Sequence, residues 1–195
     1  MKFCTECGAG VEWAIPPGDN RTRAICQSCG KIHYDNPRVL VVAFLYHKQK
    51  LLWTKRGIEP FKGLWAFPSG FLEKGETLQQ AVARENFEET HIQRSPTEMS
   101  PMSLASVMAM DQLWVAFRCR CDAEEPAELT VETADWGWYS EDEAPWQEMA
   151  YPESVVQVRQ VYEWLHEGRF AVRVGEVTPQ GGDYSTYPLA DDDEQ

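Results

Sequence analysis

Residues 70–92 read GFLEKGETLQQAVARENFEETHI and combine loop-forming glycines with a helical pattern of acidic residues. Thr77 is followed three residues later by Gln80, which fits a capping box. In such a box the two side chains satisfy the first free backbone N–H groups of a helix. A helix is therefore predicted to begin near Thr77, after an irregular loop that Pro68, Gly70 and Gly75 create.

The predicted helix carries carboxylates where core residues are expected. At about 100° per residue, the apolar stripe that begins at Leu78 continues onto Glu85 and Glu89, with Glu88 on its flank. Carboxylates at this spacing repel one another, and they do so more strongly when partly buried. Mg²⁺ or Mn²⁺ would compensate this charge, since hard cations bind oxygen ligands alongside substrate phosphates. Arg84 can also neutralise and orient the cluster, and a solvated acidic helix face is the alternative interpretation.

Four cysteines near the start of the chain form the pattern C-x2-C-x18-C-x2-C, and a glycine follows each pair. A C-x-x-C turn lets two thiolates reach one ion, and tetrahedral zinc takes four of them at about 2.3 Å. The predicted zinc site is closed and structural, because four protein ligands leave no open position. Two disulfides or a redox pair are the alternatives. The predicted ligands are Cys4, Cys7, Cys26 and Cys29.

The spacing of Gly70, Glu76 and the run RENFEE at residues 84–89 resembles the signature box of the Nudix hydrolases. In that family the box is a loop–helix–loop whose glutamates bind divalent cations, and the reaction hydrolyses a nucleoside diphosphate linked to another moiety. The resemblance implies an α/β fold, with a mixed sheet in an α/β/α sandwich. By position it implies metal ligands at Glu85, Glu88, Glu89 and the Gly70 carbonyl, with Arg84 and Glu76 positioning them.

Two positions depart from the family pattern. Asn86 stands where the family usually has an aliphatic residue, and His91 stands where it usually has glycine. Asn86 needs a hydrogen-bond partner if it is buried, and His91 must tolerate a left-handed backbone near the helix end. Neither departure removes an implied metal ligand.

The resemblance extends beyond the box to most of residues 1–178. The segments ICQSCGKIHYDNPRV, LLWTKRGIEPFKGLWAFPSGFLEKGE and EWLHEGRF are similar to zinc-ribbon Nudix proteins of the FAD and ADP-ribose pyrophosphatase type. This implies a pyrophosphohydrolase that releases AMP from FAD or ADP-ribose. NADH pyrophosphatases rank lower, because their SQPWPFPxS hallmark has no counterpart after the box. A module that binds nucleotides or proteins without catalysis is the alternative from another class.

Apolar patterns along the middle of the chain predict a mixed sheet with helices. The run RVLVVAFLY predicts a buried strand, and the alternating apolar face of the fifth predicted strand places Cys119 and Cys121 in the core. The second helix, at 153–166, is predicted to be amphipathic. The predicted strands are residues 38–46, 51–56, 64–67, 103–108, 112–121 and 136–139.

The sequence has three zones: a cysteine-bearing zone at residues 1–35, a zone with α/β patterns at 36–178 and an acidic tail at 179–195 that is expected to be flexible. The resemblance implies that the first two are a zinc ribbon and a Nudix domain. The net charge of −13 disfavours binding to nucleic acids and to anionic membranes. No segment has the length and apolar character of a membrane span, and cysteines occupy the place of a signal sequence, so a cytoplasmic protein is predicted. A homodimer is left open, because a second copy could influence substrate choice.

Several residues outside the box have a candidate role and an ordinary alternative. Arg56 ends a predicted strand and could contact a substrate phosphate, or be a surface charge. Trp65 and Phe67 could stack on a base or flavin ring, although strand aromatics more often belong to the core. Glu132 and Asp135 could supply the general base that accepts a proton from water, or be surface acids.

Overall fold

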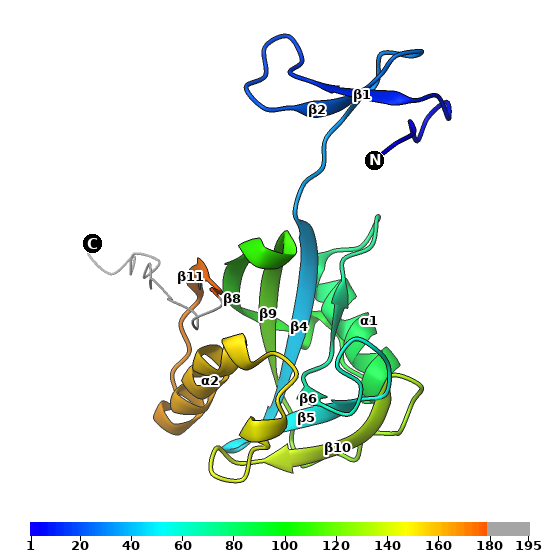
Figure 1. The fold of residues 1–195 in the computed structure, drawn as a ribbon. Helices are drawn as coiled ribbons and strands as arrows, with labels where there is room; N and C mark the ends of the chain where they lie inside the picture. Colours follow the sequence, from blue (N-terminus) through cyan, green and yellow to red (C-terminus); the bar gives the residue numbers. More distant parts are fainter. Residues whose placement is uncertain (179–195) are drawn as a thin grey trace, which may run out of the picture. The chain divides into compact units, whose positions relative to one another are not determined.

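In the computed structural model residues 1–178 are described, and the chain divides into two compact units (Figure 1). The first is Met1–Pro37 and the second begins at Arg38. The boundary lies slightly beyond the predicted end of the zinc ribbon at residue 35. The predicted acidic tail, residues 179–195, lies outside the described residues.

The first unit is an antiparallel sheet in the order β1-β2-β3. β1 (Val11–Ala14) pairs with β2 (Arg23–Cys26), and β2 pairs with β3 (Ile32–His33). Such a small sheet cannot bury enough apolar surface to fold alone, so its stability must have another source. The buried residues within 1–37 are Cys4, Pro16, Ala24 and Cys26.

The second unit is built around β4 (Arg38–His47), which pairs in parallel with β9 (Gln112–Arg120). β4 also pairs in antiparallel fashion with β5 (Lys50–Arg56) and with β7 (Ser69–Phe71). The sheet runs β10-β5-β4-β9-β8-β11, with β6 beside β5, so the predicted mixed sheet is confirmed (Figure 1). The remaining strands are β6 (Trp65–Ala66), β8 (Ser100–Val107), β10 (Thr133–Tyr139) and β11 (Arg173–Glu176).

Two helices pack on opposite faces of this sheet. Val41 and Leu45 of β4 pack in one core with α1 (Leu78–Thr90), whereas Phe44 packs in the other with α2 (Val155–Glu167). This alternation of side chains along β4 produces the predicted α/β/α sandwich. In the described part of the chain no helix has the length and apolar character that crossing a bilayer requires.

The N-terminus of α1 is fixed by the predicted capping box. Thr77 Oγ1 accepts a hydrogen bond from the Gln80 backbone N–H at 3.2 Å, and Gln80 Oε1 accepts one from the Thr77 N–H at 2.8 Å. The helix ends at His91 in a left-handed conformation with φ 57°. Asn86 is fully buried, and its Nδ2 donates to the Ile92 carbonyl at 2.7 Å. The fold accommodates both departures from the family pattern in the expected way.

Two strands of the second unit lie where the sequence predicted none. The irregular-loop prediction is wrong for β7, which pairs with β4 through Gly70 and Val41. β11 extends the sheet after α2 and runs parallel to β8. Both strands are too short for a period of two to be recognised, and they form because β4 and β8 offer backbone partners. The predicted pairing of the strands near 103–108 and 112–121 is confirmed.

Candidate active site

The four cysteine side chains of the first unit converge on one point. Cys4 Sγ lies 3.8 Å from Cys29 Sγ, and Cys7 Sγ lies 3.4 Å from Cys26 Sγ. All four sulfurs lie within 4.8 Å of one another. A zinc ion with ligands at about 2.3 Å has sulfur–sulfur edges of about 3.8 Å, whereas a disulfide bond is about 2.05 Å long. The arrangement fits four zinc thiolates and contains neither disulfide.

Two matched turns build this cluster. Gly8 and Gly30 adopt φ angles of 74° and 73°, and their N–H groups donate to the carbonyls of Cys4 and Cys26 at 3.0 and 3.1 Å. Glycine is needed at both turns, because side chains disfavour this backbone conformation. The backbone N–H of Cys29 also donates to Cys26 Sγ, which lowers the pKa of Cys26 to about 6 and favours the thiolate that zinc binds.

In the second unit Arg84 organises the acidic face of α1. Its guanidinium donates to Glu76 at 2.8 and 3.1 Å, to Glu85 at 2.7 Å and to Glu88 at 3.2 Å. It also donates to the Phe71 carbonyl at 3.2 Å, which joins the helix to β7. These contacts lower the pKa of Glu76 and raise that of Arg84. Arg84 therefore joins the loop before α1 to the helix, and its positioning role stays a prediction.

Glu89 is the most buried carboxylate of this face, with 7% of the residue exposed. Its Oε1 accepts a hydrogen bond from the Ser69 backbone N–H at 3.0 Å. Burial, together with the charges of Glu132 and Glu85, raises the pKa of Glu89 to about 8, against the opposing effects of the Ser69 hydrogen bond and of Arg56. The negative charge at this position is thus only partly balanced by the protein.

Gly70 brings β7 into close contact with α1. A Cβ atom at this position would lie 2.1 Å from Glu85 Cδ, so only glycine lets the carboxylate sit against the strand. Burial raises the pKa of Glu85 despite its contact with Arg84. Two partly desolvated carboxylates beside a backbone strand form an oxygen-rich donor set of the kind that Mg²⁺ and Mn²⁺ prefer. Glu85 and Glu89 fit a hard divalent cation, and Glu88 stands at the exposed edge of the same face.

Arg56 and Glu132 face this cluster from outside α1. Arg56 Nε donates to the Pro60 carbonyl at 2.7 Å, and its charge lowers the pKa of Glu89. The Gly57 N–H donates to the Glu132 carbonyl at 2.7 Å, which joins residue 132 to the end of β5. The charge of Glu132 raises the pKa of both Glu85 and Glu89.

Of the two residues considered as general base, the structure therefore brings Glu132 to the carboxylates. The charge of Asp135 instead acts on Tyr139, whose pKa is raised first by burial and then by Asp135. Asp135 pairs with Lys55 in the register of β10 on β5. Glu132 and Asp135 are close in sequence, but the charge of Glu132 acts on the carboxylates of α1 and that of Asp135 acts on Tyr139.

Trp65 and Phe67 lie in the core beneath α2, each with 6% exposed. The Phe67 ring packs 4.4 Å from Phe44 and 4.5 Å from Trp53. Trp65 makes an edge contact with Tyr139 at 5.5 Å. Both aromatics thus lie in the core, and Phe67 also lines a cavity.

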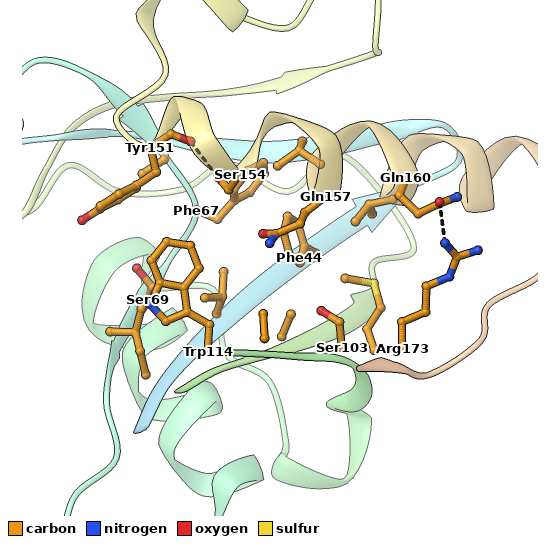
Figure 2. A pocket seen from close by; sticks show the side chains of 18 of the residues that line it. Phe44, Phe67, Ser69, Ser103, Trp114, Tyr151, Ser154, Gln157, Gln160 and Arg173 are labelled. Atoms are coloured by element: carbon orange, nitrogen blue, oxygen red, sulfur yellow. Dashed lines mark hydrogen bonds between the residues drawn. The ribbon is translucent and has the colours of Figure 1, made fainter. Parts of the chain in front are cut away.

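That cavity lies between α2 and the sheet and is called the α2 cavity here (Figure 2). It contains about 60 Å³ of space that the centre of a water molecule can reach, several times the roughly 10–15 Å³ that one water needs. Its lining is mostly apolar. Residues from both helical and strand elements contribute, among them Phe67, Ser69, Trp114, Tyr151, Gln157 and Arg173.

No sequence pattern indicates the α2 cavity, because its walls come from segments far apart in the chain. Gln157 and Tyr151 were not singled out, since an isolated polar residue on an amphipathic helix usually faces solvent. His33 was also passed over, although its Nε2 lies 3.3 Å from Cys4 Sγ. A histidine close to a cysteine pair could have suggested this contact.

Comparisons with known proteins agree with the two-unit architecture. Residues 2–35 match the family model described as Nudix N-terminal, a zinc ribbon, and residues 36–165 match the NUDIX domain model. The chain therefore belongs to the Nudix family. A crystal structure of a NUDIX hydrolase from Nitrosomonas europaea is 32% identical and covers 91% of this chain and 99% of that one, with a TM-score of 0.82.

Curated relatives include proteins with named activities. The NAD-capped RNA hydrolase NudC of Vibrio vulnificus is 30% identical over 149 residues, which are 74% of this chain and 53% of that protein. The ADP-ribose pyrophosphatase of Methanocaldococcus jannaschii is 47% identical over 57 residues, 29% of this chain and 34% of that protein. The chain thus spans about half or less of the length of these relatives.

Proposed function

We propose that the chain is a divalent-metal-dependent pyrophosphohydrolase that cleaves a nucleoside diphosphate linked to another moiety. FAD and ADP-ribose are the favoured substrates, and AMP is the expected product. The observation that carries this proposal is the buried Glu89, held against Ser69 N and surrounded by Glu85 and Glu132. Burial and mutual repulsion make this cluster of carboxylates unfavourable in the absence of a ligand. Such clusters are typical of a site that binds a cation and a phosphate.

In this proposal Glu85, Glu88, Glu89 and the Gly70 carbonyl hold Mg²⁺ or Mn²⁺. A metal ion held there would polarise phosphoryl oxygens and lower the pKa of a water molecule. Arg84 acts through other residues, because its five donors fix Glu76, Glu85 and Glu88 in position.

Two residues outside α1 complete the proposed mechanism. Glu132 is the general base, since its carboxylate faces Glu85 and Glu89 yet is not part of the helix. Arg56 binds a substrate phosphate oxygen and balances the charge on the anionic substrate. Both residues are held at the end of β5 through the backbone bond from Gly57 to Glu132.

A second candidate substrate is a nicotinamide dinucleotide. The NudC relative is named as a NAD-capped RNA hydrolase, and it matches 74% of this chain. The lack of an SQPWPFPxS segment after the box favours FAD or ADP-ribose over NADH. The net charge of −13 favours a small nucleotide over an RNA chain.

The zinc ribbon is proposed to be structural, with Zn²⁺ held by its four cysteines. Thiolate ligands require a reducing compartment, which agrees with a cytoplasmic location. The proposed domains are a zinc ribbon at 1–35, a catalytic domain at 36–178 and a tail at 179–195. Assembly as a homodimer is part of the proposal, since a second copy could complete the substrate site.

The test is product analysis of the zinc-loaded chain with Mg²⁺ or Mn²⁺ and with FAD, ADP-ribose, NADH or a nucleoside triphosphate. We expect AMP from FAD or ADP-ribose, and loss of this release in Glu88→Gln and Glu89→Gln. Glu167→Gln, at the exposed end of α2, is the matched control and should retain activity. If the folded wild type cleaves none of these compounds, the chain is better described as a binding module.

A further inference from the structure

The α2 cavity adjoins the candidate metal site through two of its lining residues. Ser69 lines the cavity, and its backbone N–H donates to Glu89 at 3.0 Å. Tyr151 also lines it, and the charges of both Arg56 and Glu89 act on the Tyr151 hydroxyl, whose pKa is raised by burial. A molecule bound at the carboxylates could therefore extend into the cavity.

The walls of the cavity suit a flat aromatic ring. Trp114 and Tyr151 meet at 5.7 Å in an edge-to-face arrangement, and Phe67 lies on the same side of the sheet. Small residues such as Ala105 and Ala116 form part of the floor on β8 and β9. Apolar walls with aromatic sides bind rings by burial and by ring contacts.

Two side-chain nitrogens that line this cavity are buried without a hydrogen bond among the described residues. One is Arg173 Nε, on a guanidinium that is otherwise paired with Gln160, and the other is Gln157 Nε2. Gln157 projects from α2 between the helix and the sheet (Figure 2). Neighbouring polar groups are engaged, since Gln160 Oε1 accepts from Arg173 at 2.6 Å and Ser154 Oγ donates to the Tyr151 carbonyl at 2.8 Å. A buried amide without a partner costs free energy, which a ligand could recover.

We propose that the α2 cavity binds the nucleobase of the substrate and that the side-chain amide of Gln157 recognises the edge of an adenine ring. This rests on the proposed function, because it places the phosphates of the same substrate at Glu85 and Glu89. An amide offers one donor and one acceptor, which match the adjacent amino group and ring nitrogen of adenine.

The composition of the cavity favours adenine over guanine. Guanine presents an amino group, a ring N–H and a carbonyl on one edge, and each needs a partner when it is removed from water. Gln160 and Arg173 also line the cavity but are paired with each other, so the amide of Gln157, the Tyr151 hydroxyl and serine hydroxyls such as Ser103 are the main groups left for a base. Adenine leaves fewer polar groups unsatisfied in such a site, so its binding is expected to be tighter.

The test is calorimetric binding of AMP, GMP and ribose 5-phosphate to the full, zinc-loaded chain with Mg²⁺. We expect AMP to bind at least tenfold more tightly than ribose 5-phosphate, which has the same sugar and phosphate without the base, and more tightly than GMP. Gln157→Leu should weaken the binding of AMP about tenfold and leave the binding of ribose 5-phosphate unchanged. Gln147→Leu, at an exposed position before α2, is the matched control.

A second variant protects the test against a change of fold. Ala105→Leu adds bulk to the cavity floor, and it should abolish the advantage of AMP over ribose 5-phosphate while circular dichroism stays that of the wild type. Equal binding of AMP and ribose 5-phosphate, tighter binding of GMP, or an unchanged AMP affinity in Gln157→Leu and Ala105→Leu would overturn the proposal.

Binding of a product requires no turnover, so this proposal and the proposed function can fail separately. Gln157-dependent AMP binding without hydrolysis of any dinucleotide would retain the base site and reject the hydrolase. If the chain releases AMP in a metal-dependent way but Gln157→Leu binds AMP as tightly as the wild type, the proposed hydrolase activity stands and the proposed base site is rejected.

Discussion

The zinc ribbon and the acidic face of α1 both gather negative charge, but they stabilise it in different ways. In the ribbon, four thiols converge on one point and the backbone donates to Cys26 Sγ, so the cluster is complete as a ligand set. On α1, Arg84 balances Glu76, Glu85 and Glu88, whereas Glu89 keeps a pKa raised to about 8. The first arrangement serves folding, and the second retains free energy that ligand binding can use.

The largest effect should come from breaking the ribbon cluster. Cys26→Ala is expected to abolish zinc binding and to unfold residues 1–37, because zinc contributes about 10–16 kcal/mol to such modules and this unit buries few residues. Zinc analysis and the dispersion of amide signals in NMR spectra measure this. Cys119→Ala, in the core of the other unit, should keep the zinc. A zinc-bound Cys26→Ala protein would contradict the ligand assignment.

The next largest effect is expected on kcat when Glu132, the proposed general base, is replaced. Glu132→Gln should lower kcat by about 10²–10⁴, the contribution typical of a general base, with zinc content unchanged. Asp135→Asn, three residues along, should stay close to the wild type because its charge acts on Tyr139. The measurement is kcat of the two variants and the wild type in steady-state kinetics with the best substrate. Equal losses in the two variants would reject Glu132 as the base.

A smaller loss is expected when the contact between β7 and α1 is widened. Gly70→Ala places a Cβ 2.1 Å from Glu85 Cδ, so strand and helix must separate. A displacement of about 1 Å in such a site can cost roughly 10²-fold in kcat/KM. Gly10→Ala in the ribbon meets no atom within 4 Å and is the control. Wild-type kinetics for Gly70→Ala would show that Glu85 need not sit against the strand.

The smallest effect is a pH dependence of stability. Without added divalent cation, Glu89 ionises near 4.5 in the unfolded chain and near 8 in the folded one. Below pH 4.5 the carboxyl of Glu89 is protonated in both the folded and the unfolded chain, so it does not change the free energy of unfolding. As the pH rises from 4.5 to 8, ionisation in the unfolded chain increasingly lowers that free energy. Glu89→Gln should therefore melt on the order of 5 °C above the wild type at pH 8 and together with it near pH 4.5. Calorimetry at the two pH values measures this, and an equal difference at both would contradict the raised pKa.

These two regions also show how far the sequence leads. The cysteine pairs and the Thr77 cap were predictable because each depends on residues close together in the chain. Glu132 could be named from the sequence but not chosen over Asp135, because the choice depends on where β10 meets β5. The α2 cavity was not predictable, since Ser69, Trp114 and Gln157 meet only in the folded sheet. Trp65 and Phe67 allowed two interpretations, core or base stacking, and the fold buries both side chains while leaving Phe67 at the wall of the α2 cavity.

The parallel pairing of β4 with β9 has a consequence for synthesis on the ribosome. β4 ends at His47 and can pair with β5 soon after it has emerged, but its parallel partner begins only at Gln112, so the edge of β4 that faces β9 stays unpaired for longer. At about 5–20 residues per second this delay lasts several seconds, during which an unpaired strand edge is prone to aggregation. The ribbon needs only residues 1–37 and a zinc ion, so it can fold before β9 has been synthesised. Chaperone dependence of the nascent chain should accordingly begin at β4 and end once β9 has emerged.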